Sequence, residues 1–194
     1  MSADEKTSIQ ARIRKLPTTS GPRPQDPMKV EHEYKRGGAL NYMAAWDVHQ
    51  AKIFGCIETR GGIESFGHLV AHVMNQEPYR SASGVFWIVD NGSSHRGQPA
   101  IMRLQERWPN AMMIHLPVHA SWLNQIEIYF SVVQRKVFTP NDFASLAEVE
   151  DRLLKFQNHY EEIAKPFEWK FTRKNLINLM DKLSDQCVLK ENAA

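Results

Sequence analysis

The sequence has few cysteines, no long apolar run and almost no net charge. Its only cysteines, Cys56 and Cys187, lie far apart, with no second cysteine or histidine at metal-binding spacing. We interpret them as reduced thiols, which excludes a disulfide framework and a zinc site. No stretch approaches the roughly 20 apolar residues of a membrane span. The opening MSADEKTSIQ lacks the apolar segment of a secretion signal. We therefore predict a cytoplasmic protein with no membrane partner.

Low-complexity sequence and internal repeats are also missing. The 42% hydrophobic content argues against disorder, and 194 residues suit one domain with a sizeable core. We therefore predict a single domain over residues 1–194. The net charge of +2 comes from 24 basic and 22 acidic residues, which is too small an excess to indicate a nucleic-acid partner by itself.

The basic residues are unevenly distributed. Between Lys6 and Arg36 there are eight basic residues and three acidic ones. Residues 15–30 contain four prolines, which disfavour helix and interior strand. We predict an extended, basic, Pro-rich loop over residues 15–38, near the first candidate acid. Contact with a phosphate backbone and an ordinary solvated loop both fit this composition. The candidate DNA contacts in and beside the loop are Arg12, Arg14, Lys15, Lys35 and Arg36.

The rest of the chain alternates strand and helix patterns. Five consecutive apolar residues, VFWIV, precede Asp90 and are typical of a strand buried on both faces of a sheet. A capping box formed by Ser145 and Glu148 predicts the start of another helix. The predicted elements are a hairpin over 39–58, a helix over 63–75, strands over 85–89 and 111–116, and helices over 98–107, 121–137, 145–162 and 172–183. This order predicts an α/β sheet with helices on its faces.

Three acidic residues occupy positions where chemistry is expected. Asp90 ends the most apolar strand, where functional groups of such sheets gather, although Asp-Asn-Gly is also good turn sequence. Glu127 lies at the edge of a helix's apolar stripe, where it needs compensation or pairing with a nearby cation. Asp4 also fits an ordinary terminal residue. Asp47 is a rival first acid, but the predicted hairpin turn already explains it.

Two histidines lie near these acids in sequence. His95 follows Asp90 and His119 precedes Glu127. Either could orient a carboxylate or contact DNA, while an ordinary hydrogen-bonded histidine is the more common case.

Several segments together resemble the DDE transposases, and most of all the bacterial insertion-sequence branch of the mariner superfamily. Residues 117–127 (PVHASWLNQIE) resemble the segment around the third acid of that family, and residues 87–95 (WIVDNGSSH) resemble its second-acid motif. There are 36 residues between Asp90 and Glu127, close to the spacing in the superfamily. Asp4-Glu5-Lys6 followed by Ile9-Gln10 resembles the segment around the first acid. Residues 34–37 and 165–169 are also similar to this branch.

This resemblance implies a ribonuclease H-like fold, a five-stranded mixed sheet flanked by helices. Asp4 would end the first strand, Asp90 the fourth, and Glu127 would face them from the long helix. It implies that these three acids are catalytic and hold two Mg²⁺ ions, with Mn²⁺ as a substitute. The implied partner is double-stranded DNA, as transposon ends and as target. Further DNA contacts are expected from His95, His119 and Asn124. A dimer with itself or with full-length transposase, near a bacterial nucleoid, is also expected.

Full-length members of the family carry helix-turn-helix modules before the catalytic domain, and this chain is expected to lack them. Three functions follow from the residues and the resemblance. The first, which we favour, is metal-dependent DNA cleavage and strand transfer in transposition of an insertion sequence. The second is a non-catalytic remnant that binds DNA or full-length transposase. The third is another ribonuclease H-like nuclease, against which the segment ending in Glu127 argues.

Overall fold

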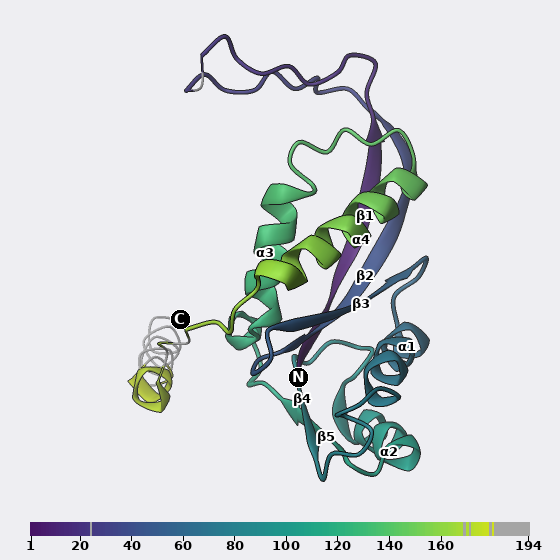
Figure 1. Ribbon diagram of the computed structural model, residues 1–194, viewed down its shortest axis with the longest axis vertical. Coiled ribbons are helices and arrows are strands. Elements are labelled where there is room, and N and C mark those ends of the chain that lie inside the picture. The colour runs from purple at the N-terminus through teal and green to yellow at the C-terminus, as the bar shows by residue number, and fades with distance from the viewer. Residues whose placement is uncertain (24, 169, 171, 179, 181–194) are drawn as a thin grey trace, which may run out of the picture.

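The computed structural model describes residues 1–23, 25–168, 170, 172–178 and 180, and its centre is a five-stranded sheet with helices on both faces (Figure 1). The strands are β1 (Ser2–Ile13), β2 (Lys35–Asp47), β3 (Lys52–Glu58), β4 (Val85–Val89) and β5 (Ala111–His115). Across the sheet their order is β3-β2-β1-β4-β5. The β1–β2 and β2–β3 pairs are antiparallel, whereas β1–β4 and β4–β5 are parallel. The predicted five-stranded mixed sheet is therefore confirmed.

Helices cover the two faces in pairs. The helices are α1 (Ile63–Met74), α2 (Gly97–Arg107), α3 (Ile126–Lys136) and α4 (Leu146–Ile163), with a short 3₁₀ turn η1 (Ser121–Leu123) before α3. In Figure 1, α1 and α2 lie beside the lower right of the sheet, and α3 and α4 cross its other face. Burial follows this layering, because Leu69 of α1 and Tyr129 of α3 belong to different hydrophobic clusters.

Strand β2 explains why two cores form. Its side chains alternate between faces, so Tyr42 and Trp46 pack against α3 and α4 while Met43 packs against α1. All three are fully buried. Trp87 of β4 is also fully buried on the α1 side. The prediction that the VFWIV strand is buried on both faces is wrong, because buried Val85, Trp87 and Val89 alternate with Phe86, which is 53% exposed, and with half-buried Ile88.

The β2–β3 hairpin turns at Asp47, as predicted. The Asp47 carboxylate accepts the backbone N–H of His49 (2.8 Å) and of Gln50 (3.0 Å), and its other oxygen accepts the hydroxyl of Tyr79 (2.6 Å). Asp47 is 6% exposed, so these three donors satisfy a buried carboxylate. The turn therefore accounts for Asp47, which has no part in the candidate site.

Helix α3 begins later than predicted. The sequence pattern predicts a helix from Ser121, but the backbone of Asn124 is extended (φ −75°, ψ 113°) and α3 starts at Ile126. The side chain of Asn124 bonds to β1 instead of to a helical neighbour, which is a tertiary effect that helical periodicity does not register. Helix α4 follows the prediction more closely. Ser145 accepts the N–H of Glu148 (3.2 Å), while the Glu148 carboxylate reaches back to the N–H of Ala144 (2.8 Å).

Strands β1 and β2 continue as a long arm beyond the helices, which we define as the β1–β2 arm (residues 12–36). In Figure 1 this arm rises to the top of the molecule, opposite the N-terminus. The predicted loop over 15–38 is too long, because β2 begins at Lys35 and pairs there with Ile13. Within the described part of the arm, one isolated bridge, Thr19 with Lys29, links the two sides of the loop.

Several predictions concern the C-terminal part of the chain. Residues 173–178 are helical, in agreement with the first part of the predicted 172–183 helix. The rest of that helix from 181 onward, Trp169 and Cys187 lie outside the described residues. Cys56 is a free thiol, as predicted. Within the described residues, no helix combines the length and apolar character that crossing a bilayer requires.

Candidate active site

Asp90 directly follows β4 and forms a tight turn with the next two residues. Its Oδ1 accepts the backbone N–H of Gly92 (2.7 Å) and a hydrogen bond from Nε2 of His95 (2.6 Å). A Cβ added to Gly92 would lie 2.9 Å from this oxygen, so a side chain there would force the carboxylate to move. The turn and acid interpretations of Asp90 therefore apply together. The turn holds a carboxylate at the carboxyl end of β4, with its side chain 30% exposed.

His95 is a buried partner of Asp90, with 1% of its surface exposed. A carboxylate oxygen accepts hydrogen bonds, so Nε2 of His95 is the donor. On the other side of the ring, Nδ1 lies 2.9 Å from the hydroxyl of Ser94. The backbone oxygen of His95 accepts from Nε2 of His115 (2.7 Å). Of its two predicted roles, orienting a carboxylate matches this geometry, whereas a side chain so buried is not on a surface that DNA reaches.

Asp4 is the third residue of β1, which corrects the expectation that it ends the first strand. It is 6% exposed and lies on the sheet face covered by α3. Its Oδ1 accepts the N–H of Glu5 (2.8 Å) and its Oδ2 accepts the amide of Asn124 (3.3 Å). The pKa of Asp4 is raised to about 7, mainly by burial and then by the charges of Asp90 and Glu127, and these two hydrogen bonds only partly oppose the rise.

Glu127 is the second residue of α3 and is half-buried. Burial raises its pKa, the charge of Lys6 opposes that rise, and the charge of Asp90 adds to it. Lys6 is itself half-buried, and burial lowers its pKa while Glu127 opposes that fall. Lys6 and Glu127 affect each other's pKa, but no ion pair within 4.0 Å joins them among the described residues. The alternative that a nearby cation pairs with Glu127 is therefore met only by this longer-range attraction to Lys6.

The three acids share one electrostatic environment. Asp4 is affected by both Asp90 and Glu127, and Glu127 by Asp90, although β1, the end of β4 and α3 supply them separately. Among the described residues, however, no group of three or more His, Cys, Asp or Glu side chains is gathered closely enough to hold a metal ion. The donor chemistry does fit Mg²⁺, a hard cation that prefers carboxylate oxygens. A divalent cation would also relieve the repulsion that raises these pKa values.

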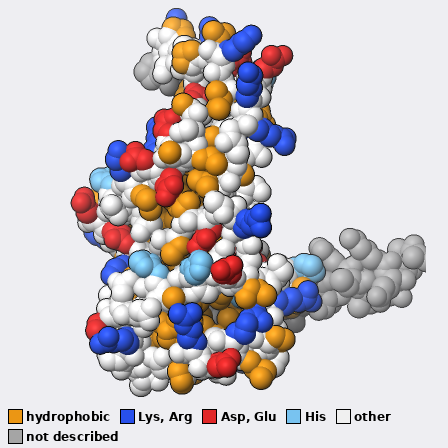
Figure 2. Space-filling view, turned by 90° about the vertical axis from the view of Figure 1, so that its right-hand side faces the viewer, with side chains coloured by type: hydrophobic (Ala, Val, Ile, Leu, Met, Phe, Trp, Pro, Cys, Tyr) orange, Lys and Arg blue, Asp and Glu red, His pale blue; other side chains and the backbone are white. Residues whose placement is uncertain are grey.

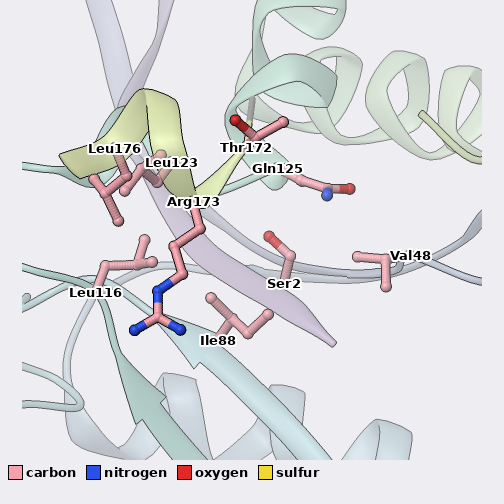
Figure 3. A pocket seen from close by; sticks show the side chains of 9 residues that line it. All are labelled: Ser2, Val48, Ile88, Leu116, Leu123, Gln125, Thr172, Arg173 and Leu176. Carbon is pink, nitrogen blue, oxygen red and sulfur yellow. The ribbon is translucent and has the colours of Figure 1, made fainter. Parts of the chain in front are cut away.

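A pocket of about 290 Å³ lies next to this region but is a different feature (Figure 3). It separates β1 and β4 from residues 172–176, and Figure 3 shows Arg173 reaching across it toward Ile88. Its lining is mainly apolar and includes none of the three acids. Chemistry at the acids therefore does not use this cavity.

Asn124 and His119, both predicted as DNA contacts, lie in very different surroundings. Asn124 is 1% exposed, and its amide donates to the backbone oxygen of Ala3 (2.9 Å) as well as to Asp4. A DNA contact by Asn124 is incompatible with this burial, because both amide hydrogens are used inside the protein. His119 is exposed and has a left-handed backbone (φ 62°), so its ring is available on the surface.

The predicted basic contacts belong to the β1–β2 arm, which is remote from the acids. Arg12 is eight residues beyond Asp4 along β1, or about 26 Å at the usual strand rise. The expectation that this segment lies near the first acid is therefore wrong. The Arg14 guanidinium pairs with Asp142 and is only 8% exposed, and Arg12 stacks on the Tyr34 ring at 4.9 Å. Of the predicted contacts, Lys15, Lys35 and Arg36 are exposed, as are Arg23 and Lys29 elsewhere in the arm. Figure 2 shows blue side chains along the upper end of the molecule.

Two residues near the acids were not identified from the sequence. Lys6 and Ser2 flank Asp4 at two-residue spacing, so strand alternation puts all three on one face of β1. Strand alternation would have placed Ser2 and Lys6 beside Asp4 if residues 2–6 had been assigned to a strand. The polar composition SADEK conceals the strand, because its partners, rather than its own apolar residues, bury it.

Comparison with known proteins agrees with this geometry. A crystal structure described as the Mos1 mariner paired end complex with Mn has the same fold, with a TM-score of 0.58 and 16% sequence identity. The likeness covers 81% of this chain but 47% of that one. It confirms the ribonuclease H-like fold. No curated protein matches the sequence. Residues 3–150, which include all three acids, match the family described as DDE superfamily endonuclease. Because that match spans well over half of its length, the chain belongs to the DDE superfamily endonucleases.

Proposed function

We propose that this chain is the catalytic domain of a transposase from the bacterial insertion-sequence branch of the mariner superfamily, which cleaves DNA and transfers strands. The observation that carries the proposal is that the charges of Asp90 and Glu127 both raise the pKa of Asp4, and the charge of Asp90 also raises that of Glu127, in addition to the larger effect of burial. Three carboxylates from two strands and one helix repel one another unless a cation compensates them. Such an arrangement is costly for a purely structural role and useful for a metal-dependent nuclease.

In this proposal, Asp4, Asp90 and Glu127 hold two Mg²⁺ ions, for which Mn²⁺ can substitute. Ions bound there would activate a water and stabilise the leaving oxygen of a phosphodiester. The protein's own residues prepare the site. His95 and the N–H of Gly92 fix one oxygen of Asp90 in direction. Lys6 brings positive charge beside Glu127, which reduces the repulsion between the acids and an approaching DNA phosphate.

The proposed partner is double-stranded DNA, as transposon ends and target, in the cytoplasm at the nucleoid. Exposed cations of the β1–β2 arm, among them Lys15, Lys35 and Arg36, supply affinity for phosphates away from the acids. Because the arm lies about 26 Å from Asp4, it would contact DNA outside the cleavage point. A second copy of the chain or a full-length transposase completes the assembly.

A non-catalytic domain that binds DNA or full-length transposase is the second candidate. One observation favours it: no three potential ligands among the described residues are near enough to hold a metal ion. In this alternative the acids would be inherited but unable to converge. The two proposals differ in whether Mn²⁺ binds and whether DNA is cut.

The discriminating experiment incubates the protein with supercoiled plasmid and Mn²⁺ and measures nicking. A short duplex with a free 3′-hydroxyl end is included to detect joining. We expect weak, metal-dependent nicking by the wild type and none by Glu127→Gln, which keeps the shape of the side chain but removes a negative ligand. The Tm of this variant without metal should be unchanged or slightly higher, because burial and Asp90 both disfavour the Glu127 charge.

Glu162→Gln is the matched control, since Glu162 lies on the exposed surface of α4 with its side chain 76% exposed. It should nick like the wild type. Nicking that survives in Glu127→Gln would refute the role of Glu127. A folded wild type that binds Mn²⁺ but never nicks DNA would favour the non-catalytic candidate.

A further inference from the structure

Asn124 connects the strand that carries Asp4 to the helix that carries Glu127. It lies between the 3₁₀ turn η1 and α3 and is 1% exposed. Its amide nitrogen donates to the backbone oxygen of Ala3 (2.9 Å) and to Oδ2 of Asp4 (3.3 Å). Its amide oxygen accepts the hydroxyl of Ser2. All three partners lie at the start of β1, more than a hundred residues away in sequence.

The same residue also bonds to Glu127. The backbone oxygen of Asn124 accepts the N–H of Glu127 (3.0 Å). The Ser2 hydroxyl in turn accepts the N–H of Ile126 (3.0 Å), the first residue of α3. The first N–H groups of a helix have no partner within the helix, so Ser2 satisfies one of them from another element. Asn124 and Ser2 thus fix the first turn of α3 against β1.

This connection bears on the distance between the two acids. Asp4 sits in a rigid strand, and Glu127 sits in the first turn of a helix, where backbones fray most readily. Buried side chains such as Tyr129 and Val133 hold the rest of α3 in the core, so the connection matters for its first turn, which carries Glu127. With the connection, one side chain contacts the Asp4 carboxylate while its own backbone holds the residue that bears the Glu127 carboxylate.

We propose that Asn124 is a positioning residue that holds Asp4 and Glu127 at the separation needed to share bound metal ions. This inference rests on the proposed function, because it presupposes that the two acids bind metal. Asn124 acts through the Asp4 carboxylate and the backbone of Glu127 and touches no substrate. The Ser2 hydroxyl is the second part of the same connection.

The test compares Asn124→Ala with Asn110→Ala, a matched control. The Asn110 amide also donates to two backbone oxygens, those of Tyr79 (3.0 Å) and Ala82 (2.9 Å), but contacts neither acid. Each variant loses a half-buried or buried amide, so both should lower the Tm. Mn²⁺ affinity is measured by electron paramagnetic resonance of free Mn²⁺. It should fall about 10–100-fold in Asn124→Ala and not in Asn110→Ala, because removing a group that orients metal ligands costs affinity in this range. The Mn²⁺ concentration for half-maximal plasmid nicking should rise in parallel.

Ser2→Ala provides a milder variant in case Asn124→Ala does not fold. It leaves the Asn124 amide on Asp4 and removes only the link to Ile126, so its Mn²⁺ affinity should fall less but measurably. An equal loss of affinity in Asn110→Ala would overturn the proposal, since general loosening would then explain the effect. Unchanged affinity in Asn124→Ala, or in Ser2→Ala if only that variant folds, would also overturn it. If the wild type binds no Mn²⁺ at all, the proposed metal site fails and the positioning role fails with it.

Discussion

Replacing Asp4 with asparagine removes the charge of the most deeply buried of the three acids, and we expect it to stabilise the protein at high pH. The pKa of Asp4 rises from 3.8 to about 7, first because of burial and then because of Asp90. Since the folded protein holds this proton more tightly than the unfolded chain, stability falls as the pH rises from about 4 to about 7. Above that range the whole cost of the charged carboxylate is present.

The magnitude follows from the shift. A difference of roughly 3 pH units corresponds to about 4 kcal/mol at 1.36 kcal/mol per unit. The asparagine has one oxygen where Asp4 uses two, so it satisfies only one of the donors Glu5 and Asn124, a loss of about 1 kcal/mol. Asp4→Asn should therefore be about 3 kcal/mol more stable than the wild type at pH 8.5 without metal. For a domain of this size the Tm would rise by about 6–12 °C.

The assay is urea and thermal unfolding in EDTA between pH 4 and pH 9. The advantage of Asp4→Asn should shrink as the pH falls and disappear near pH 4, because Asp4 is then protonated in the folded protein and the unfolded chain, with its pKa of 3.8, is beginning to take up the same proton. Equal stabilities of the two proteins at pH 8.5 would refute the reasoning, because the buried charge would then carry no cost.

Asp47→Asn is a control of opposite sign, since Asp47 is also 6% exposed. Burial alone would raise the pKa of Asp47, but hydrogen bonds from Tyr79, Gln50 and His49 outweigh it and lower the pKa. Its charge therefore stabilises the fold above the unfolded pKa, and that stability is lost as the pH falls through the folded value. Asp47→Asn should be less stable than the wild type at pH 8.5, with the deficit fading in acid.

Two further predictions concern the β1–β2 arm. Arg14→Met should lower the free energy of unfolding, measured in urea, by about 2 kcal/mol, because it leaves the partly buried carboxylate of Asp142 without its ion-pair partner. The control is Lys15→Met at an exposed position, and an equal loss of stability in the two variants would contradict this prediction. Changing Lys15, Lys35 and Arg36 together to glutamine should reduce the slope of log binding constant against log salt for a short duplex by roughly 2.7, at 0.9 per phosphate contact. An unchanged slope would show that the arm is a solvated loop.

The sequence by itself determined those features that neighbouring residues decide. The apolar run before Asp90 correctly predicted a strand, but only one face of that strand is buried, since Phe86 on the other face is 53% exposed. Asp47 and Ser145 were correctly assigned to a turn and a helix cap, since a short polar side chain there bonds to backbone N–H groups two or three residues away. The α/β sheet with helices on its faces followed from the order of the elements, whereas its five strands and mixed directions were implied by the family resemblance.

The surroundings of the candidate site residues were decided only by the tertiary structure. His95 was predicted to orient a carboxylate or to contact DNA, and its bond to Asp90 fits the first role. Asn124 was predicted to contact DNA, but it is buried beside Asp4. Arg14 was assigned to DNA binding, yet its partner Asp142 lies 128 residues further along the chain. No local pattern encodes a pairing at that separation, because it depends on how α3 and the segment after it pack against β1.

The same reason explains the start of α3 and the ionisation of Asp4. The helical spacing of apolar residues continued back to Ser121. However, Ser2 of β1 bonds to the side chain of Asn124 and to the N–H of Ile126, and these bonds outweighed one further turn of helix. The raised pKa of Asp4 needs burial under α3 together with the charges of Asp90 and Glu127. The sequence thus identified which acids to consider. The environment that sets their charge exists only once strand, turn and helix are packed together, because burial and Coulomb interactions depend on distances in space.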